Sequence, residues 1–268
     1  MRINTNLSAM IATNQMTKNT ALAGNSMEKL STGLRITKAG DDAAGLAISE
    51  KMRAQIRGME QADRNVQDGI SLVQTAEGAL EESGNILQRM RELTVQGAND
   101  TLVEEDREKI EGELTQLGEE LGQIAKETKF NGKTLLSTAT TITIQAGANS
   151  ESRKIVTINL ASQATSVANL KVTNASVAQK SQATIDAALK AVNTGRANLG
   201  AMQNRLEYTS SNLVTSTENL TAAESRIRDI DVAKEMVKLS KLNILNQASQ
   251  AMVGQAKQQP ESVAQLLR

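Results

Sequence analysis

Several residue types that carry specific chemistry are missing or scarce in this 268-residue chain. It has no cysteine, no histidine and no tryptophan, a single proline, and only two aromatic residues, Phe130 and Tyr208. Without cysteine, disulfides, thiolate metal sites and a thiol nucleophile are excluded. Without histidine, HExxH metal sites and Ser–His or Cys–His nucleophile pairs are excluded as well. Because no GxxxxGK[ST] or GxGxxG motif occurs either, we expect no enzyme and no cofactor.

Neither the charge nor the hydropathy of the chain is concentrated in one region. Lys and Arg total 30, Asp and Glu total 30, and the two signs are interspersed, so no basic stripe indicates nucleic-acid binding. No apolar run approaches the roughly 18–20 residues that cross a bilayer, so we expect no membrane insertion. The start, MRINTNLSAMIATNQ, has no continuous apolar h-region, and export would therefore need a route other than a cleaved signal peptide.

Heptad repeats are the strongest pattern present. In the second half an apolar residue recurs every seven positions, at Ile185, Val192, Leu199, Leu206, Leu213, Leu220 and Ile227. The first half offers a partner repeat at Val66, Val73, Leu80 and Leu87. A helix over 185–230 would be roughly 70 Å long, beyond the diameter of about 45–50 Å of a compact globule of this size. The repeats predict a mainly α fold, an elongated rod of long antiparallel helices in a coiled-coil-like bundle.

Only the middle of the chain has a different pattern. TTITIQ (140–145) and KIVTINL (154–160) alternate apolar and polar residues, and the connecting AGANSESR is rich in turn formers. This pattern predicts a small β-hairpin. The Ser/Thr/Ala-rich stretch that follows, up to about residue 182, is expected to be loop and irregular structure.

Both ends of the chain carry apolar residues at helical spacing. The main ones are Leu7, Met10 and Ile11 at the front, and Leu239, Leu242, Leu245, Met252, Val253, Leu266 and Leu267 at the back. A monomer could cover these residues only by packing the ends against each other or against neighbours.

The stretch KAGDDAAGLAIS (38–49) contains two adjacent carboxylates, Asp41 and Asp42, between Gly40 and Gly45. A Ca²⁺ loop would need acids at alternating positions and a distal Glu. Adjacent carboxylates in a turn also point apart, which is poor geometry for an acid pair. The stretch therefore predicts a tight turn with an Asp cap that starts a helix at Ala43.

Five stretches together resemble bacterial flagellin. They are INTNLSAM (3–10), EKLSTGLRITKAGDDAAGLAIS (28–49), LQRMRELTVQGAND (87–100), KFNGKTLL (129–136) and AESRIRDIDVAKEMVKLSKLNILNQASQAM (223–252). They cover both ends and most of the helical part of the chain. The centre departs from many members of the family, because the short segment 138–182 stands in place of large variable outer domains.

The resemblance implies a division of the chain into four parts. These are paired terminal helices forming the inner filament core (1–34 and 232–268), a connecting spoke that contains the Gly40–Gly45 joint (35–56), a helical rod (57–137 and 183–231), and the hairpin region (138–182).

The resemblance also implies a function and a set of partners. The chain would polymerise with copies of itself into the extracellular flagellar filament used for motility, after secretion through the flagellar type III export apparatus. An export chaperone would cover the apolar terminal residues before secretion, and filament cap and junction proteins would contact the assembled subunit.

Host Toll-like receptor 5 is a further partner implied by the resemblance. The matching epitope positions are Arg89, Leu93, Gln96 and Glu113. A simpler interpretation makes Arg89 and Glu92 a solvated helix face and Leu93 a packing residue.

Two other classes compete with a filament subunit. A hook–filament junction protein shares the terminal helices. A signalling coiled coil, such as a chemoreceptor hairpin, explains the heptads but neither the apolar ends nor the β-hairpin.

Overall fold

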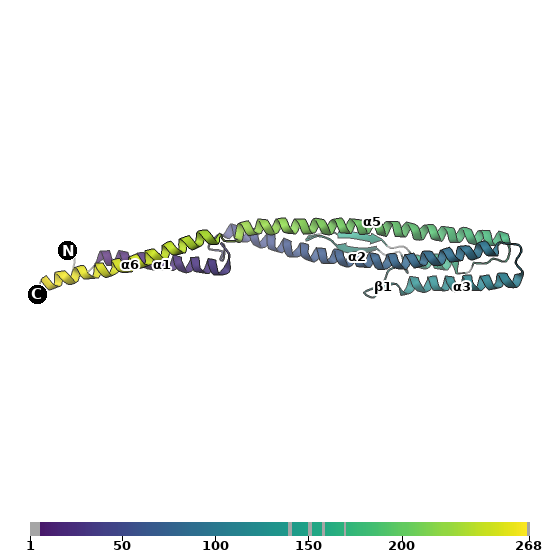
Figure 1. The fold of residues 1–268 in the computed structure, drawn as a ribbon, viewed down its shortest axis with the longest axis horizontal. Helices are drawn as coiled ribbons and strands as arrows, with labels where there is room; N and C mark the ends of the chain where they lie inside the picture. The colour runs from purple at the N-terminus through teal and green to yellow at the C-terminus, as the bar shows by residue number, and fades with distance from the viewer. Residues whose placement is uncertain (1–5, 139–140, 150–151, 157–158, 169, 267–268) are drawn as a thin grey trace. The chain divides into compact units, whose positions relative to one another are not determined.

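The computed structural model describes residues 6–138, 141–149, 152–156, 159–168 and 170–266. The chain forms two compact units, which we call the terminal unit (Met1–Ala54 and Asn219–Arg268) and the central unit (Gln55–Glu218). The elements, in chain order, are α1 (Leu7–Thr32), α2 (Ala43–Gly97), α3 (Glu104–Glu127), β1 (Lys129–Phe130), β2 (Lys133–Thr134), β3 (Thr141–Gln145), β4 (Ser152–Val156), α4 (Leu160–Val167), α5 (Ala175–Arg228) and α6 (Val232–Leu266) (Figure 1). The predicted mainly α fold is confirmed.

In the central unit, α2 and α5 run antiparallel. Ser210 Oγ donates to Asp63 Oδ1 at 2.6 Å near one end. Arg91 donates to Asp186 Oδ1 at 2.7 Å near the other end. Because the residue number rises along α2 as it falls along α5, the two helices point in opposite directions, as the paired heptads predict.

The heptad residues form the core of this unit. Val66, Val73, Leu80 and Leu87 of α2 and Ile185, Val192, Leu199 and Leu206 of α5 are buried in one hydrophobic cluster. Helix α3 adds Ile110, Leu114 and Leu121 to the same cluster. The hydrophobic effect thus holds three long helices together through a seam that recurs every seven residues.

The hairpin prediction is confirmed, with different strand boundaries. β3 and β4 pair antiparallel, with Thr141 opposite Val156 and Gln145 opposite Ser152. β4 is Ser152–Val156, residues 157 and 158 lie outside the described residues, and Leu160 begins α4 instead of ending a strand. Ile144 is buried against α2, where a Cβ at Gly69 would lie 2.1 Å from Ile144 Cδ1, so the glycine leaves room for the hairpin.

The expectation of loop up to residue 182 is wrong, because this stretch contains α4 and the start of α5. Asn159 caps α4 by accepting from Ser162 N at 2.9 Å. Leu160, Ala164 and Val167, which are four and then three residues apart, are buried on one face of α4. The helix is therefore stabilised by tertiary packing, which outweighs the weak helix propensity of its Ser and Thr residues.

In the terminal unit, α1 and α6 lie side by side (Figure 1). Asn6 Nδ2 donates to the carbonyl of Ala256 at 2.7 Å. Thr20 Oγ1 lies 3.5 Å from Asn246 Oδ1. The two contacts give an antiparallel arrangement, and the predicted pairing of the N- and C-terminal helices is confirmed.

Candidate functional site: the joint and the outward helix faces

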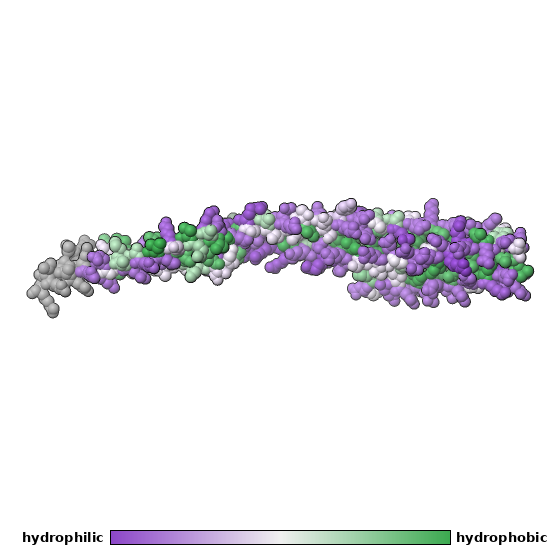
Figure 2. All heavy atoms as spheres, in the orientation of Figure 1, coloured by the Kyte–Doolittle hydropathy of each residue, from purple (hydrophilic) through white to green (hydrophobic). Residues whose placement is uncertain are grey.

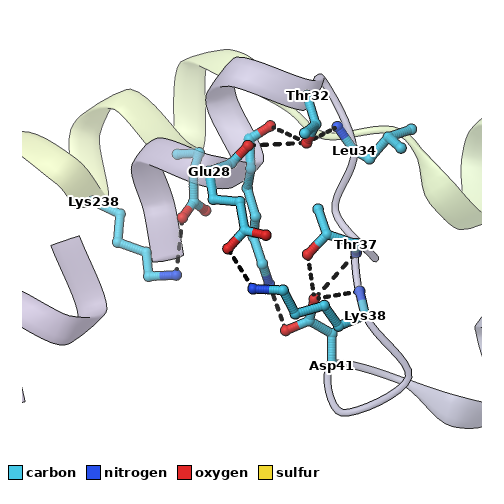
Figure 3. Close-up of polar contacts among 9 residues, drawn as sticks. Glu28, Thr32, Leu34, Thr37, Lys38, Asp41 and Lys238 are labelled. Carbon is cyan, nitrogen blue, oxygen red and sulfur yellow. Dashed lines mark hydrogen bonds and ion pairs between the residues drawn. The ribbon is translucent and has the colours of Figure 1, made fainter. Parts of the chain in front are cut away.

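The joint between α1 and α2 is organised by Asp41. Its Oδ2 accepts from Thr37 N at 3.1 Å, Thr37 Oγ1 at 3.0 Å and Lys38 N at 3.3 Å. Figure 3 shows these donors converging on one carboxylate oxygen. The backbone N–H and then the hydroxyl of Thr37 lower the pKa of Asp41 to about 2. The carboxylate therefore stabilises the turn as long as it stays ionised.

Asp42 has a separate role at the start of α2. Its Oδ1 accepts from Gly45 N at 2.9 Å, an N-terminal cap. A Cβ on Gly45 would lie 2.5 Å from Asp42 Oδ2 and 2.8 Å from Ile36 Cδ1. The prediction of a turn with an Asp cap and a helix start at Ala43 is confirmed. The two adjacent carboxylates serve different partners.

The joint also hydrogen-bonds to the connection between α5 and α6. Arg35 N donates to the carbonyl of Arg228 at 2.7 Å, and Ile230 N donates to the carbonyl of Gly33 at 3.1 Å. Gly33 ends α1 in the left-handed conformation, with a φ of 70°, which glycine adopts without steric cost. The two connections of the terminal unit are thus held together by backbone hydrogen bonds.

Ion pairs surround this junction. Lys29 lies 3.4 Å from Asp41, and Lys38 lies 2.8 Å from Glu28. On α6, Lys238 pairs with Glu235 at 3.1 Å. These pairs are partly exposed, so each contributes little alone, and together they favour one geometry at the junction.

The paired terminal helices carry large apolar side chains on their outward surface (Figure 2). Among the predicted assembly residues, Leu7, Met10, Ile11, Leu245 and Met252 are exposed. Leu239 and Leu242 are buried, and Val253 is half-buried. Leu266 and Leu267 lie outside the residues whose side chains are described.

The buried side chains of α1 are small and polar, whereas α6 buries Leu239 and Leu242. Asn19 and Ser26 are the buried residues of α1, whereas Leu22 and Met27 on the same helix are exposed. An ordinary amphipathic helix shows the opposite distribution. Contiguous apolar faces left exposed in this way are unusual in a monomeric soluble protein.

The predicted receptor residues divide into exposed and buried groups. Arg89, Gln96 and Glu113 are exposed, and Arg89 donates to Glu113 at 2.9 and 3.1 Å and to Glu92 at 3.3 Å. Glu113, and then Glu92, raise the pKa of the Arg89 guanidinium. Leu93 is only 2% exposed and belongs to the core cluster.

A shallow groove of 630 Å³ lies along the same part of α2. It is lined by Gln88, Arg91, Glu92, Val95 and Gln96. Sequence reasoning missed Val95, although its exposed position next to the buried Leu93 and Thr94 could have been found from the helical period. It also missed Arg35 and Arg228, which gave no signal because their contacts join distant parts of the chain.

Neither a metal-ion cluster nor a membrane-spanning helix occurs in the described ranges. Within them, no three Asp, Glu, His or Cys side chains gather in a way that could hold a metal ion. No helix in the same ranges combines the length and apolarity that crossing a bilayer requires.

Long antiparallel helices, a capped joint and outward apolar faces define a helical structural protein. The bacterial flagellin N-terminal helical region matches residues 3–141, and the flagellin C-terminal helical region matches residues 182–267. Flagellin from Halalkalibacterium halodurans is 56% identical over the full length of both chains, and flagellin from Bacillus subtilis is 46% identical, also over both full lengths. The chain belongs to the bacterial flagellin family.

Solved structures agree with this assignment. The crystal structure of Bacillus cereus flagellin is 33% identical, with a TM-score of 0.51, over 60% of this chain and 94% of that one. A protein assigned to the flagellar hook-associated proteins, from Vibrio parahaemolyticus, has a TM-score of 0.60 over 70% of this chain and all of that one, at 12% identity. That likeness shows the fold alone, and the junction-protein alternative is not favoured.

Proposed function

We propose that this chain is the subunit of a flagellar filament and polymerises with copies of itself. The observation that carries the proposal is the terminal helix pair, which exposes Ile11 and Ile244 while burying Asn19 and Ser26. Contact with further copies would remove the apolar faces from water. A contact between different faces of identical subunits that does not close into a ring produces an open helical polymer. Full-length relatives named flagellin support this role.

The four-part division predicted from the sequence belongs to this proposal. Segments 1–34 and 232–268 form the inner core of the filament, and 35–56 is the connecting spoke. The rod consists of 57–137 and 183–231, and 138–182 replaces the outer domains. The Asp41 and Asp42 contacts support the spoke assignment, because they hold the turn between α1 and α2 in one conformation.

Substitution of the outward apolar residues tests polymerisation. Ile11→Ser together with Ile244→Ser removes two apolar side chains that are 60% and 62% exposed, so the isolated subunit should keep its stability. We expect the double variant to form sedimentable polymer only at a subunit concentration about tenfold higher than the wild type needs, or more. Val103→Ser is the matched control, because Val103 is 62% exposed but lies in the central unit. Unchanged polymer yield from the double variant would argue against the proposal.

We also propose that the apolar surface of α6 binds an export chaperone before the chain is secreted through the type III apparatus to the extracellular filament. Leu245 and Met252 are exposed there, and Val237, Ser240, Lys241, Ile244 and Leu245 line a shallow apolar depression. Cap and junction proteins would contact the subunit after export. Deletion of 242–268 should abolish chaperone binding in calorimetry, and unchanged binding would contradict this assignment.

Recognition by Toll-like receptor 5 is the third part of the proposal. Arg89, Gln96 and Glu113 would contact the receptor, since all three are exposed and Arg89 is oriented by Glu113. Leu93 would act by packing beneath them.

A reporter-cell assay of the monomer distinguishes residues that contact the receptor from Leu93, which would only pack beneath them. Arg89→Ala plus Gln96→Ala should reduce signalling strongly without changing thermal stability. Arg205→Ala, at an exposed charge on α5, should leave signalling unchanged. Leu93→Ala should cost about 2–5 kcal/mol of stability, as truncation of a buried leucine does. Equal signalling from the double variant and the wild type would contradict the epitope.

A further inference from the structure

Among the described residues, the most exposed methionines lie on the terminal helices. The chain has ten methionines, and four of them, Met10, Met27, Met236 and Met252, are 53–65% exposed. All four lie on α1 or α6. In the central unit, Met90 is fully buried at 0%.

A thioether in this position is open to a specific modification. Hydrogen peroxide transfers one oxygen atom to the sulfur of methionine. The O–O bond breaks, an S=O bond forms, the sulfur loses two electrons and water leaves. Susceptibility follows access to the sulfur, so exposed thioethers react before buried ones. The product replaces a flexible apolar group with a polar hydrogen-bond acceptor.

We propose that Met10, Met27, Met236 and Met252 of the free subunit are oxidation sites, and that their conversion to the sulfoxide blocks elongation of the polymer. The second half of this inference depends on the proposed polymerisation. Each of the four side chains belongs to the apolar surface that assembly would bury. Assembly would bury the sulfoxide oxygen at a surface that offers it no dedicated hydrogen-bond donor. The cost of removing this acceptor from water opposes association.

The same geometry makes oxidation depend on the assembly state. Once subunits pack against one another, the four sulfur atoms are covered and peroxide no longer reaches them. Met90 is inaccessible in both states, because it lies in the core of the central unit. It therefore provides an internal reference.

The first experiment maps oxidation in the full-length subunit. Free subunit and preformed polymer are treated with hydrogen peroxide, and each methionine is followed by peptide mass spectrometry. We expect the four exposed methionines to oxidise well before Met90 in the free subunit, and to be protected in the polymer. Oxidation of Met90 at the same rate as Met10, under conditions that leave the helical circular dichroism intact, would overturn the site assignment.

The second experiment measures elongation from seeds. Oxidised subunits should need a concentration roughly tenfold higher or more than untreated ones. Treatment with methionine sulfoxide reductases should restore elongation, because the sulfoxide is reversible. A variant with all four residues changed to leucine removes the sulfur at nearly constant volume and should elongate equally well before and after peroxide.

The outcomes separate this inference from the proposed function. The oxidation inference is overturned if oxidised wild-type subunits elongate at the same concentration as untreated subunits. If the leucine variant fails to elongate even untreated, recovery of oxidised wild type by the reductases decides the question, and absence of recovery overturns the inference. Untreated subunits that never elongate would contradict the proposed polymerisation instead, while the oxidation map would still decide the four sites.

Discussion

At the scale of single residues, the joint depends on glycines and carboxylates whose roles differ although they are neighbours in sequence. Asp41 holds the turn, Asp42 caps α2, and Gly45 leaves space for that cap. A Cβ on Gly40 would have no atom within 4 Å, and the φ of Gly40 lies outside the left-handed region. The two glycines of this stretch are therefore not equivalent.

Gly45→Ala should destabilise the terminal unit by about 1–2 kcal/mol. The new methyl group collides with Asp42 and Ile36, and the loss of the cap exceeds the gain in helix propensity. Gly40→Ala should change stability by less than about 0.5 kcal/mol. Urea unfolding followed by circular dichroism measures both variants. Equal stabilities of the two variants would show that the close approach of Asp42 and Ile36 to Gly45 does not affect stability.

The pH dependence of stability should reflect Asp41. Its pKa falls from 3.8 to about 2 in the folded chain. The stabilisation is therefore fully present above about pH 4 and is lost as the pH falls through about 2. Asp41→Asn should lower the melting temperature at neutral pH and flatten the melting profile between pH 4 and pH 2. A profile identical in shape to that of the wild type would contradict this role.

The residue scale also shows where sequence reasoning succeeds and where it fails. The capping role of the Asp41–Asp42 stretch could be predicted, because short polar side chains beside glycine act on the local backbone. The sequence does not decide whether Leu93 packs in the core or contacts a receptor. Both roles are compatible with a helix, and only the neighbouring helices determine which face is covered. Ion pairs such as Lys29 with Asp41 could not be predicted, because they depend on how the turn folds back.

At the scale of elements, long periodic helices were predicted and short packed ones were not. The heptads over α2 and α5 specify both elements and their pairing, because each buried position repeats many times. Helix α4 has only eight residues and weak propensity, so its stability comes from packing on α3. Because that contact is tertiary, the local sequence gives little information about it.

The packing of α4 on α3 gives a test at this scale. A Cβ on Gly118 would lie 2.8 Å from the backbone Cα of Ala168, just past the end of α4. Gly118→Ala should therefore displace α4 and cost about 1–3 kcal/mol. Gly112 and Gly122 lie on the same helix, and a methyl group there would have no atom within 4 Å. Gly112→Ala and Gly122→Ala should each raise the free energy of unfolding by about 0.5–1 kcal/mol. Thermal unfolding of the three variants checks this order, and stabilisation by Gly118→Ala would contradict the packing account.

At the scale of the whole molecule, the distribution of apolar surface separates two kinds of structure. The central unit buries its heptad leucines, isoleucines and valines internally, as a self-sufficient bundle does. The terminal unit leaves many of its large apolar side chains exposed. The sequence predicts apolar residues at both ends but leaves open whether the two ends cover each other or pack against neighbours. Which of them face outward could not be predicted, since that depends on how α1 and α6 pack against each other.

The central claim is that copies of this chain cover one another's terminal helices in an open polymer. The most direct test is seeded elongation of the purified full-length chain, examined by electron microscopy. The account predicts long filaments of uniform diameter that grow from seeds above a critical subunit concentration. Subunits with intact termini that stay dispersed, or that close into rings of fixed size, would contradict it.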